Sequence, residues 1–268
     1  MESISLPNFN HIYKDRSIFL TGASGLVGKV VVEKLIHALP GVNTIFILIR
    51  ASRGKSGAER WKEIEKMELF NRIRRDCPDR LSKVVPVEGD ITLPDLGIST
   101  TDMRRILEET SVVMHCAATV RFDEPLAAAV EINMRGATRV VSLAHRMPKL
   151  ECFLHCSTTF VNADKVGHPI EEKVYPAPCD PHKLMEASDW MPDSLYGAIG
   201  EEASKAYSNT YCFTKALSEA ESVCNEESRN RFDLPYLQHL VVDEAASLPT
   251  IIFRPAIIAG VWKDGIPG

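Results

Sequence analysis

Short runs of aliphatic and β-branched residues alternate along the chain with longer segments in which apolar residues recur every three or four positions. The runs predict strands at residues 17–21, 44–49, 83–87, 111–115, 150–157 and 250–253, and the segments predict helices at 25–39, 57–75, 125–146 and 203–220. The strand runs are continuously apolar, which is typical of parallel strands covered on both faces. We therefore expect an α/β fold with a doubly wound parallel sheet of the Rossmann type.

Two segments break this pattern. Residues 164–196 are rich in proline and charge and predict a long loop or lid. Residues 220–238 are polar and contain Pro235, which costs about 3 kcal/mol inside a helix. We expect this second segment to be an insertion that loops out into solvent.

Composition places the chain among ordinary globular proteins, with 268 residues, 45% hydrophobic and 25% charged. The net charge of -5 shows no basic footprint, so nucleic acid is not an expected partner. The polar N-terminus lacks the apolar segment of a signal peptide, and no run approaches the roughly 18 apolar residues of a membrane span. We expect no membrane segment in this chain.

The cysteines are odd in number and scattered, without a CxxC pair, and they predict reduced thiols that serve mainly as small apolar core residues. They are Cys77, Cys116, Cys152, Cys156, Cys179, Cys212 and Cys224. Cys152 and Cys156 share one predicted strand, where their spacing does not bring the sulfurs together. No metal site is predicted.

A glycine-rich turn joins the first predicted strand to the first predicted helix, with Gly22, Gly25 and Gly28 three residues apart. Such glycines permit a tight turn and a close backbone approach, and the helix N-terminus then offers free N–H groups to a pyrophosphate. A packing turn is the alternative reading of the glycines alone. Their place after the first strand of an α/β chain favours dinucleotide binding.

The residues after the second predicted strand bear on cofactor choice. An acidic residue there binds the 2′-hydroxyl of NAD(H), whereas a basic one suits the 2′-phosphate of NADP(H). The strand ends in Arg50, with Arg53 and Lys55 nearby and no Asp or Glu. We therefore predict NADPH. Asp90 and Ile91 follow the third strand and are placed either to meet the adenine or to form a simple turn.

Tyr211 and Lys215 lie four residues apart in a predicted helix and so face the same side. An ammonium near a phenol favours the phenolate and lowers its pKa, which suits acid–base chemistry. The hydroxyls of Ser157, Thr158 and Thr159 follow the fifth predicted strand and could bind a substrate oxygen opposite the tyrosine. The combination indicates a reductase site.

With these residues the chain resembles the extended short-chain dehydrogenase/reductases, and more narrowly the alcohol-forming fatty acyl-CoA reductases abundant in insects. The segments HCAATVRFDE, at residues 115–124, and NTYCFTKALSE, at residues 209–219, carry the narrower resemblance. It implies NADPH-dependent reduction of a long-chain fatty acyl-CoA to a fatty alcohol through an aldehyde, with release of CoA, as in wax and lipid biosynthesis.

The resemblance also implies roles for individual residues. It assigns catalysis to Thr158, Tyr211 and Lys215, with Ser157 as the alternative hydroxyl. It assigns cofactor binding to Gly22, Ser24, Gly25, Leu26, Val27, Gly28, Arg50, Arg53, Asp90, Ile91, Ala117, Ala118, Asn133 and Lys215. His115 and His155 are expected to be packed, hydrogen-bonded core residues.

The resemblance implies a domain organisation and leaves alternatives open. Residues 1–14 would be an extension and 15–268 the NADP-binding reductase domain, without the family's C-terminal domain. One alternative is a catalytically impaired, truncated NADPH-binding isoform, and another is a thioester reductase that acts on carrier-bound acyl groups. A cytoplasmic location, at the peroxisome, endoplasmic reticulum or lipid droplets, is implied; no oligomeric state is predicted.

Overall fold

The computed structural model describes residues 9–222 and 248–258. Its six strands form one sheet in the order β3-β2-β1-β4-β5-β6, and every neighbouring pair is parallel. The strands are β1 Ser17–Thr21, β2 Ile45–Ile49, β3 Val84–Glu88, β4 Thr110–His115, β5 Cys152–Cys156 and β6 Thr250–Phe253. This is the strand order of a doubly wound Rossmann-type sheet, so the predicted fold class is confirmed.

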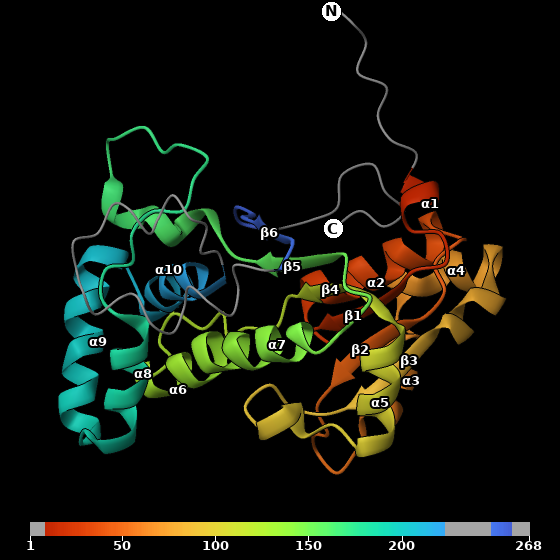
Figure 1. The fold of residues 1–268 in the computed structure, drawn as a ribbon, viewed down its shortest axis with the longest axis horizontal. Coiled ribbons are helices and arrows are strands. Elements are labelled where there is room, and N and C mark those ends of the chain that lie inside the picture. Colours follow the sequence, from red (N-terminus) through yellow and green to blue (C-terminus); the bar gives the residue numbers. More distant parts are fainter. Residues whose placement is uncertain (1–8, 223–247, 259–268) are drawn as a thin grey trace, which may run out of the picture.

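Helices cover both faces of the sheet (Figure 1). The α-helices are α1 Phe9–Ile12, α2 Leu26–Ala38, α3 Gly57–Ile64, α4 Asn71–Asp76, α5 Thr100–Glu109, α6 Leu126–Ala129, α7 Gly136–His145, α8 Pro181–Trp190, α9 Asp193–Tyr207 and α10 Thr210–Ser222. The π-helical turn Val130–Arg135 joins α6 to α7, so the predicted helix at 125–146 is present as one continuous element.

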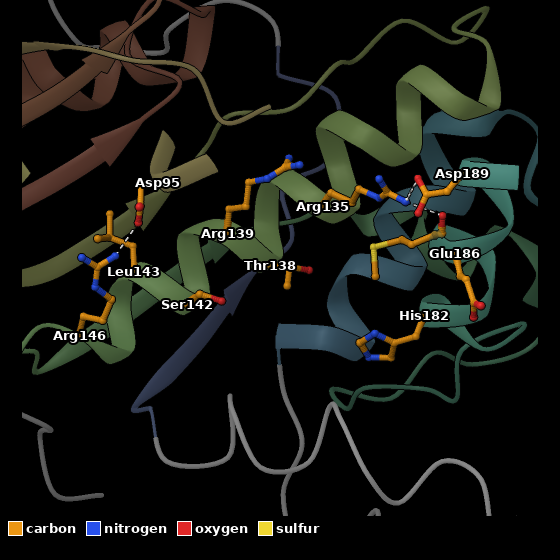
Figure 2. A pocket seen from close by; sticks show the side chains of 11 residues that line it. Asp95, Arg135, Thr138, Arg139, Ser142, Leu143, Arg146, His182, Glu186 and Asp189 are labelled. Carbon is orange, nitrogen blue, oxygen red and sulfur yellow. Dashed lines mark hydrogen bonds and ion pairs between the residues drawn. The ribbon is translucent and has the colours of Figure 1, made fainter. Parts of the chain in front are cut away.

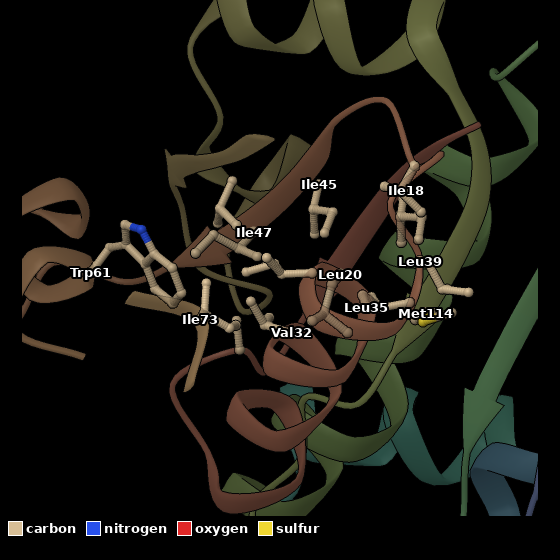
Figure 3. Packing of buried hydrophobic residues seen from close by; sticks show 14 of the residues in the cluster. Ile18, Leu20, Val32, Leu35, Leu39, Ile45, Ile47, Trp61, Ile73 and Met114 are labelled. Atoms are coloured by element: carbon tan, nitrogen blue, oxygen red, sulfur yellow. The ribbon is translucent and has the colours of Figure 1, made fainter. Parts of the chain in front are cut away.

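Successive side chains of the strands point to opposite faces of the sheet and pack into two separate hydrophobic cores. Ile18 and Leu20 of β1 pack with α2, α3 and α4 on one face, as Figure 3 shows for Val32, Trp61 and Ile73. Phe19, between them in sequence, faces the opposite core with residues of α5 and α7. Because both faces of β1 and β2 are buried in these cores, their sequences lack the alternation of a half-exposed sheet.

A third apolar cluster lies beyond the sheet, where α8 and α9 form the other end of the molecule (Figure 1). Leu126, Met134 and Leu184 are buried there against Tyr196 of α9 and Phe213 of α10. This cluster fixes α10 on the side of the sheet that carries β5 and β6, and α10 is the helix that holds Tyr211 and Lys215.

The predicted helix at 57–75 is wrong in its continuity, because the chain breaks between α3 and α4. Ser56 and Glu59 form a capping box that starts α3, and Met67 is extended before a short 3-10 turn. Trp61 and Phe70 meet edge to face, with ring centroids 5.5 Å apart, in the same core. Nine residues correspond to opposite sides of a straight helix at 3.6 residues per turn, so the chain must bend to bury both rings.

The predicted loop or lid at 164–196 is wrong in part, because it contains α8 and the start of α9. Asp180 caps α8 by accepting hydrogen bonds from the backbone N–H groups of His182 and Lys183, with Pro181 at the first helical position. This is a standard start signal that the high charge and proline content of the segment obscured.

The single helix predicted at 203–220 is also wrong, because it spans the end of α9 and the start of α10. Ser208 adopts a left-handed conformation with φ of 69° and ends α9. Asn209 then accepts a hydrogen bond from the N–H of Cys212 at 2.8 Å and begins α10. Residues 220–222 continue α10, and the remainder of the predicted insertion, 223–238, lies outside the described residues.

Candidate active site

The site predicted from sequence lies at the carboxyl ends of β1 and β4, which are neighbours in the sheet although they are far apart in sequence. The chain turns to opposite sides of the sheet after these two strands. In doubly wound sheets such a switch point opens a crevice in which ligands bind. The glycine turn follows β1, and Cys116, Ala117 and Ala118 follow β4 at this place.

The glycine turn leaves no room for side chains at two positions. Gly22 has φ of +79°, and a Cβ there would lie 2.7 Å from the backbone nitrogen of Ala117. A Cβ at Gly28 would lie 2.2 Å from the carbonyl oxygen of Gly22. Gly25 precedes α2 without a side-chain cap, so the first N–H groups of the helix keep their capacity to bind an anion. This geometry fits a pyrophosphate, with exposed Ser24 and Leu26 and half-buried Val27 at its rim.

The basic residues after β2 lie in open surroundings. The guanidinium of Arg50 is 67% exposed and lies 3.5 Å from Asp90. Arg53 sits in a tight turn, with φ of 54°, closed by hydrogen bonds between Ser52 and Lys55. The structure therefore brings Arg50 to the predicted adenine segment, where its charge can reach a phosphate at the end of the strand.

Asp90 forms a local turn, because its Oδ1 accepts hydrogen bonds from the N–H and the hydroxyl of Thr92. Ile91 is buried and packs on Gly136, where a Cβ would lie 2.9 Å from its Cδ1. Arg139 donates to the carbonyl of Ile91 at 3.1 Å. These contacts hold Asp90 and Ile91 in a defined turn beside the crevice. They leave open both predictions for the segment, an adenine contact and a simple turn.

Thr158 and Tyr211 are brought together from β5 and α10. Thr158 is 4% exposed and caps the following 3-10 turn by accepting from the N–H of Phe160. Burial raises the pKa of Tyr211, and a hydrogen bond with Thr158 lowers it by less. The pKa of Tyr211 is thus raised overall, and Lys215 is not among the groups that lower it, so the expected effect of the ammonium is not found in this structure. Ser157 is buried with no hydrogen-bond partner for its hydroxyl in the described chain.

The position of the Lys215 side chain explains why its ammonium does not lower the pKa of Tyr211. Its Nζ donates to the backbone carbonyl of Cys156 at 2.8 Å and lies 3.1 Å from Nε2 of His155. Lys215 is 2% exposed, and burial lowers its pKa to about 8. The ammonium is therefore held at the end of β5, immediately before the serine and threonine hydroxyls.

Asn133 lies in the π-helical turn between α6 and α7, and it is 1% exposed. Its side chain accepts from the N–H of Thr119 at 2.9 Å and donates to Thr214 at 3.0 Å. It therefore joins the loop after β4 to α10. A π-helical turn is often found at functional sites.

Sequence reasoning missed several polar contacts around these residues. Thr21 hydrogen-bonds Nδ1 of buried His115 at 2.8 Å and accepts from the N–H of Ala117 at 3.2 Å. The Cys116 and Cys156 thiols, at the ends of adjacent strands, hydrogen-bond each other, which raises the pKa of Cys116 and lowers that of Cys156. The parallel register of β4 and β5 is the signal that places these cysteines together.

A buried ion pair fixes the far end of α10. Arg254, just after β6, binds Glu219 through its Nε and Nη2 atoms, with the shorter contact at 2.6 Å.

The remaining cysteines differ in exposure. Cys212 is buried, as predicted, whereas Cys179 is exposed, so it is not a core residue.

A separate cavity of about 450 Å³ lies between α7 and α8 (Figure 2). Arg135, Arg139 and Arg146 line it, but each forms an ion pair with a carboxylate, at 2.6 to 2.7 Å. None of its lining residues belongs to the glycine turn, the strand ends or α10. This cavity is therefore not the predicted cofactor site.

The strand order and the glycine turn are those of a Rossmann-type domain with the extended short-chain dehydrogenase/reductase fold. Residues 20–235 match a family of NAD-binding domains described as male sterility protein. The chain belongs to the male sterility protein family. Across residues 9–222 and 248–258, no helix combines the length and hydrophobicity that crossing a bilayer requires.

Several similar proteins are named fatty acyl-CoA reductases. Fatty acyl-CoA reductase 1 of Mus musculus is 37% identical over 265 residues, which is 99% of this chain and 47% of that protein. A putative fatty acyl-CoA reductase of Drosophila melanogaster is 38% identical over 257 residues, 96% of this chain and 46% of that protein. The chain thus spans about half the length of these relatives.

Solved structures share the fold. The terminal R domain of the myxalamid PKS-NRPS biosynthetic pathway superposes with a TM-score of 0.61 at 24% identity, over 92% of this chain and 50% of that one. The Bordetella bronchiseptica enzyme WbmH, in complex with NAD+, has a TM-score of 0.52 at 16% identity, over 91% of this chain and 57% of that one.

Proposed function

We propose that this chain is the NADPH-binding, catalytic part of a fatty acyl-CoA reductase that converts a long-chain acyl-CoA to a fatty alcohol through the aldehyde, with release of CoA. The observation that carries the proposal is the meeting of Thr158, Tyr211 and Lys215 at the end of β5, beside the switch point that holds the glycine turn. The named relatives support the choice of an acyl-CoA substrate.

Some residues of the crevice bind the cofactor, and others donate protons or hydrogen bonds to the substrate. NADPH, when bound, supplies the hydride. Gly22 and Gly28 let the backbone approach the pyrophosphate, and Arg50 binds the 2′-phosphate. Asp90 and Ile91 flank the adenine, while Ala117 and Ala118 line the nicotinamide side.

Thr158 and Tyr211 present hydroxyl donors to the substrate oxygen and stabilise the negative charge that develops there. Tyr211 then donates its proton to that oxygen when the aldehyde is reduced. Lys215 is fully buried within reach of the same strand end, where its ammonium orients the cofactor ribose.

The test is NADPH oxidation by the purified 268-residue chain with palmitoyl-CoA and stearoyl-CoA, followed by analysis of the lipid products. Two NADPH consumed per fatty alcohol formed is the expected stoichiometry, whereas one NADPH per aldehyde would show that reduction stops halfway. Turnover of acyl groups on a phosphopantetheine carrier, without turnover of the CoA esters, would favour the carrier-bound alternative. Stabilisation by NADPH against thermal unfolding without any turnover would favour the impaired isoform.

A further inference from the structure

His155 is a buried strand residue whose hydrogen bonding is unusual. Its side chain is fully buried on β5, and Nε2 lies 3.1 Å from Nζ of Lys215. Its other ring nitrogen, Nδ1, has no hydrogen-bond partner among the described residues. A histidine retained for packing normally satisfies its buried nitrogens, and an orphaned buried polar atom costs stability. Among the described residues, the hydrogen bond to Lys215 is therefore the contact that can explain why a histidine stands here.

The chemistry of the two groups fixes the direction of this bond. An ammonium has three N–H donors and no acceptor, so Nε2 of His155 must accept and the ring must carry its proton on Nδ1. The orphaned atom is then an N–H group. Burial and the nearby Lys215 keep the pKa of His155 well below its ordinary value, which agrees with a neutral acceptor.

His155 supplies half of the acceptors that the described chain gives to Lys215. The carbonyl of Cys156 takes a second N–H at 2.8 Å, and the third N–H is left for a ligand. The titratable groups that interact with Lys215 are Glu219 on its own helix, His155 and Cys156 on β5, and His115 and Cys116 at the end of β4. His115 is neutral near pH 7, because burial lowers its pKa to about 3.

We propose that His155 is a positioning residue, whose neutral Nε2 holds the ammonium of Lys215 at the end of β5 and keeps it charged and directed at the cofactor ribose. This inference rests on the proposed function in that Lys215 is taken to bind the cofactor. In this proposal the imidazole of His155, which is fully buried, acts through Lys215 alone.

The expected consequence is a shift in pH dependence. Burial already lowers the pKa of Lys215 to about 8, so the side chain loses its charge just above neutrality. A hydrogen bond to a charged group changes an equilibrium by about ten- to a hundredfold. Removal of the acceptor therefore moves the loss of charge down by about one pH unit or more.

The experiment compares His155→Leu with His155→Gln in the full chain. Gln places its amide oxygen near the position of Nε2 and restores an acceptor, whereas Leu fills the space without one. His145→Leu is the matched control, because Nε2 of His145 is also buried without a partner but lies at the end of α7. The readouts are the NADPH dissociation constant between pH 6.5 and 9.5 and, separately, kcat over the same range.

In the wild-type chain NADPH affinity should fall around pH 8, and in His155→Leu around pH 7. His155→Gln and His145→Leu should follow the wild-type profile. An unchanged pH profile in His155→Leu would overturn the proposal.

His155→Val, which also lacks an acceptor and suits a strand, takes the place of His155→Leu if that variant does not fold. Failure of both to fold would make His155 a structural core residue and would equally overturn the proposal. The two proposals remain distinguishable, because NADPH binding is measured without acyl-CoA. Shifted binding profiles without acyl-CoA turnover would support the role of His155 and reject the proposed substrate. Absence of NADPH binding to the wild-type chain would reject both.

Discussion

The side-chain amide of Asn133 donates to the hydroxyl of Thr214 at 3.0 Å, and this bond ties the π-helical turn to α10 one residue before Lys215. The Thr214 hydroxyl in turn donates a hydrogen bond to the carbonyl oxygen of Thr210 at 2.8 Å, so it acts both as acceptor and as donor. The same amide contacts both the N–H and the carbonyl of Thr119. One buried side chain thus fixes the loop after β4 relative to the helix that carries the catalytic candidates.

Asn133→Ala should lower the free energy of unfolding by about 2–4 kcal/mol, because it leaves the half-buried N–H of Thr119 and the buried Thr214 hydroxyl without this partner. Urea denaturation measures the loss. Asn43→Ala is the control, since the side chain of Asn43 makes a single half-buried bond to Ser17 at 3.2 Å and its loss should cost about 1 kcal/mol. Equal losses in the two variants would mean that the network around Asn133 adds nothing.

Gly22→Ala should destabilise the chain far more than Gly54→Ala, although both glycines have positive φ, of 79° and 72°. At Gly54 a Cβ meets nothing within 4 Å, so only the left-handed backbone is penalised, by about 1–2 kcal/mol. At Gly22 the Cβ also meets backbone atoms of Cys116 and Ala117 at 2.7 Å. The difference between the two unfolding free energies measures the cost of that close approach, and a difference near zero would refute it.

The sequence predicted the sheet and the cofactor turn well because their signals are local. Uninterrupted apolar runs marked the strands, and the glycine turn marked the switch point between β1 and β4. The helices at 164–222 were predicted poorly for the opposite reason. Asp180 and Asn209 are capping signals of single residues, and Ser208 ends α9 through a left-handed conformation that serine rarely adopts.

The sequence predicted on which elements the candidate site residues lie, but it did not predict the contacts among them. Spacing alone places Tyr211 and Lys215 on one face of a helix, and α10 confirms that placement. The hydrogen bond from Lys215 to Cys156 and its contact with His155 depend on how α10 packs over β5, and the residues involved are about 60 positions apart. No periodicity along the chain carries that information, so the direction of the Tyr211 pKa shift was mispredicted.

Arg50→Ala should weaken NADPH binding by about ten- to a hundredfold and leave NADH binding nearly unchanged, because a charge-assisted bond from arginine to the 2′-phosphate is lost. Fluorescence titration with the two cofactors measures the effect. Arg75→Ala is the control, since Arg75 is exposed on α4 and paired with Asp76. Equal weakening of both cofactors by Arg50→Ala would move the phosphate contact to another residue.

Tyr211→Phe should lower turnover by about a hundred- to ten-thousandfold, the usual contribution of general acid–base catalysis, while NADPH binding survives. The ring is retained, so its contact with Phe122, at 6.0 Å between centroids, is kept. Tyr13→Phe is the control. It removes the hydroxyl of a tyrosine that packs against the core containing Ile18 and Leu20, away from the site, and it should leave turnover intact. Steady-state kinetics compares the two, and full activity of Tyr211→Phe would assign the proton to another group.

Lys215→Met should change how the stability of the fold depends on pH. Burial lowers the native pKa of Lys215 from 10.5 to about 8, so between these values the unfolded chain binds more protons than the native one. The stability contributed by this group therefore rises with pH through that window, by up to about 1.4 kcal/mol per pH unit. The variant lacks the buried ammonium and should be the more stable chain at pH 7.5. Its advantage should shrink by about 2 kcal/mol at pH 9.5.

Urea denaturation of both chains at the two pH values checks this expectation, since every other titrating group is common to them. Lys149→Met provides the control, because Lys149 is an exposed lysine outside the candidate site. A constant difference for Lys215→Met would mean that the amine binds its proton equally well in the native and unfolded chains. The desolvation of the ammonium would then be offset in full by its hydrogen bonds at the end of β5.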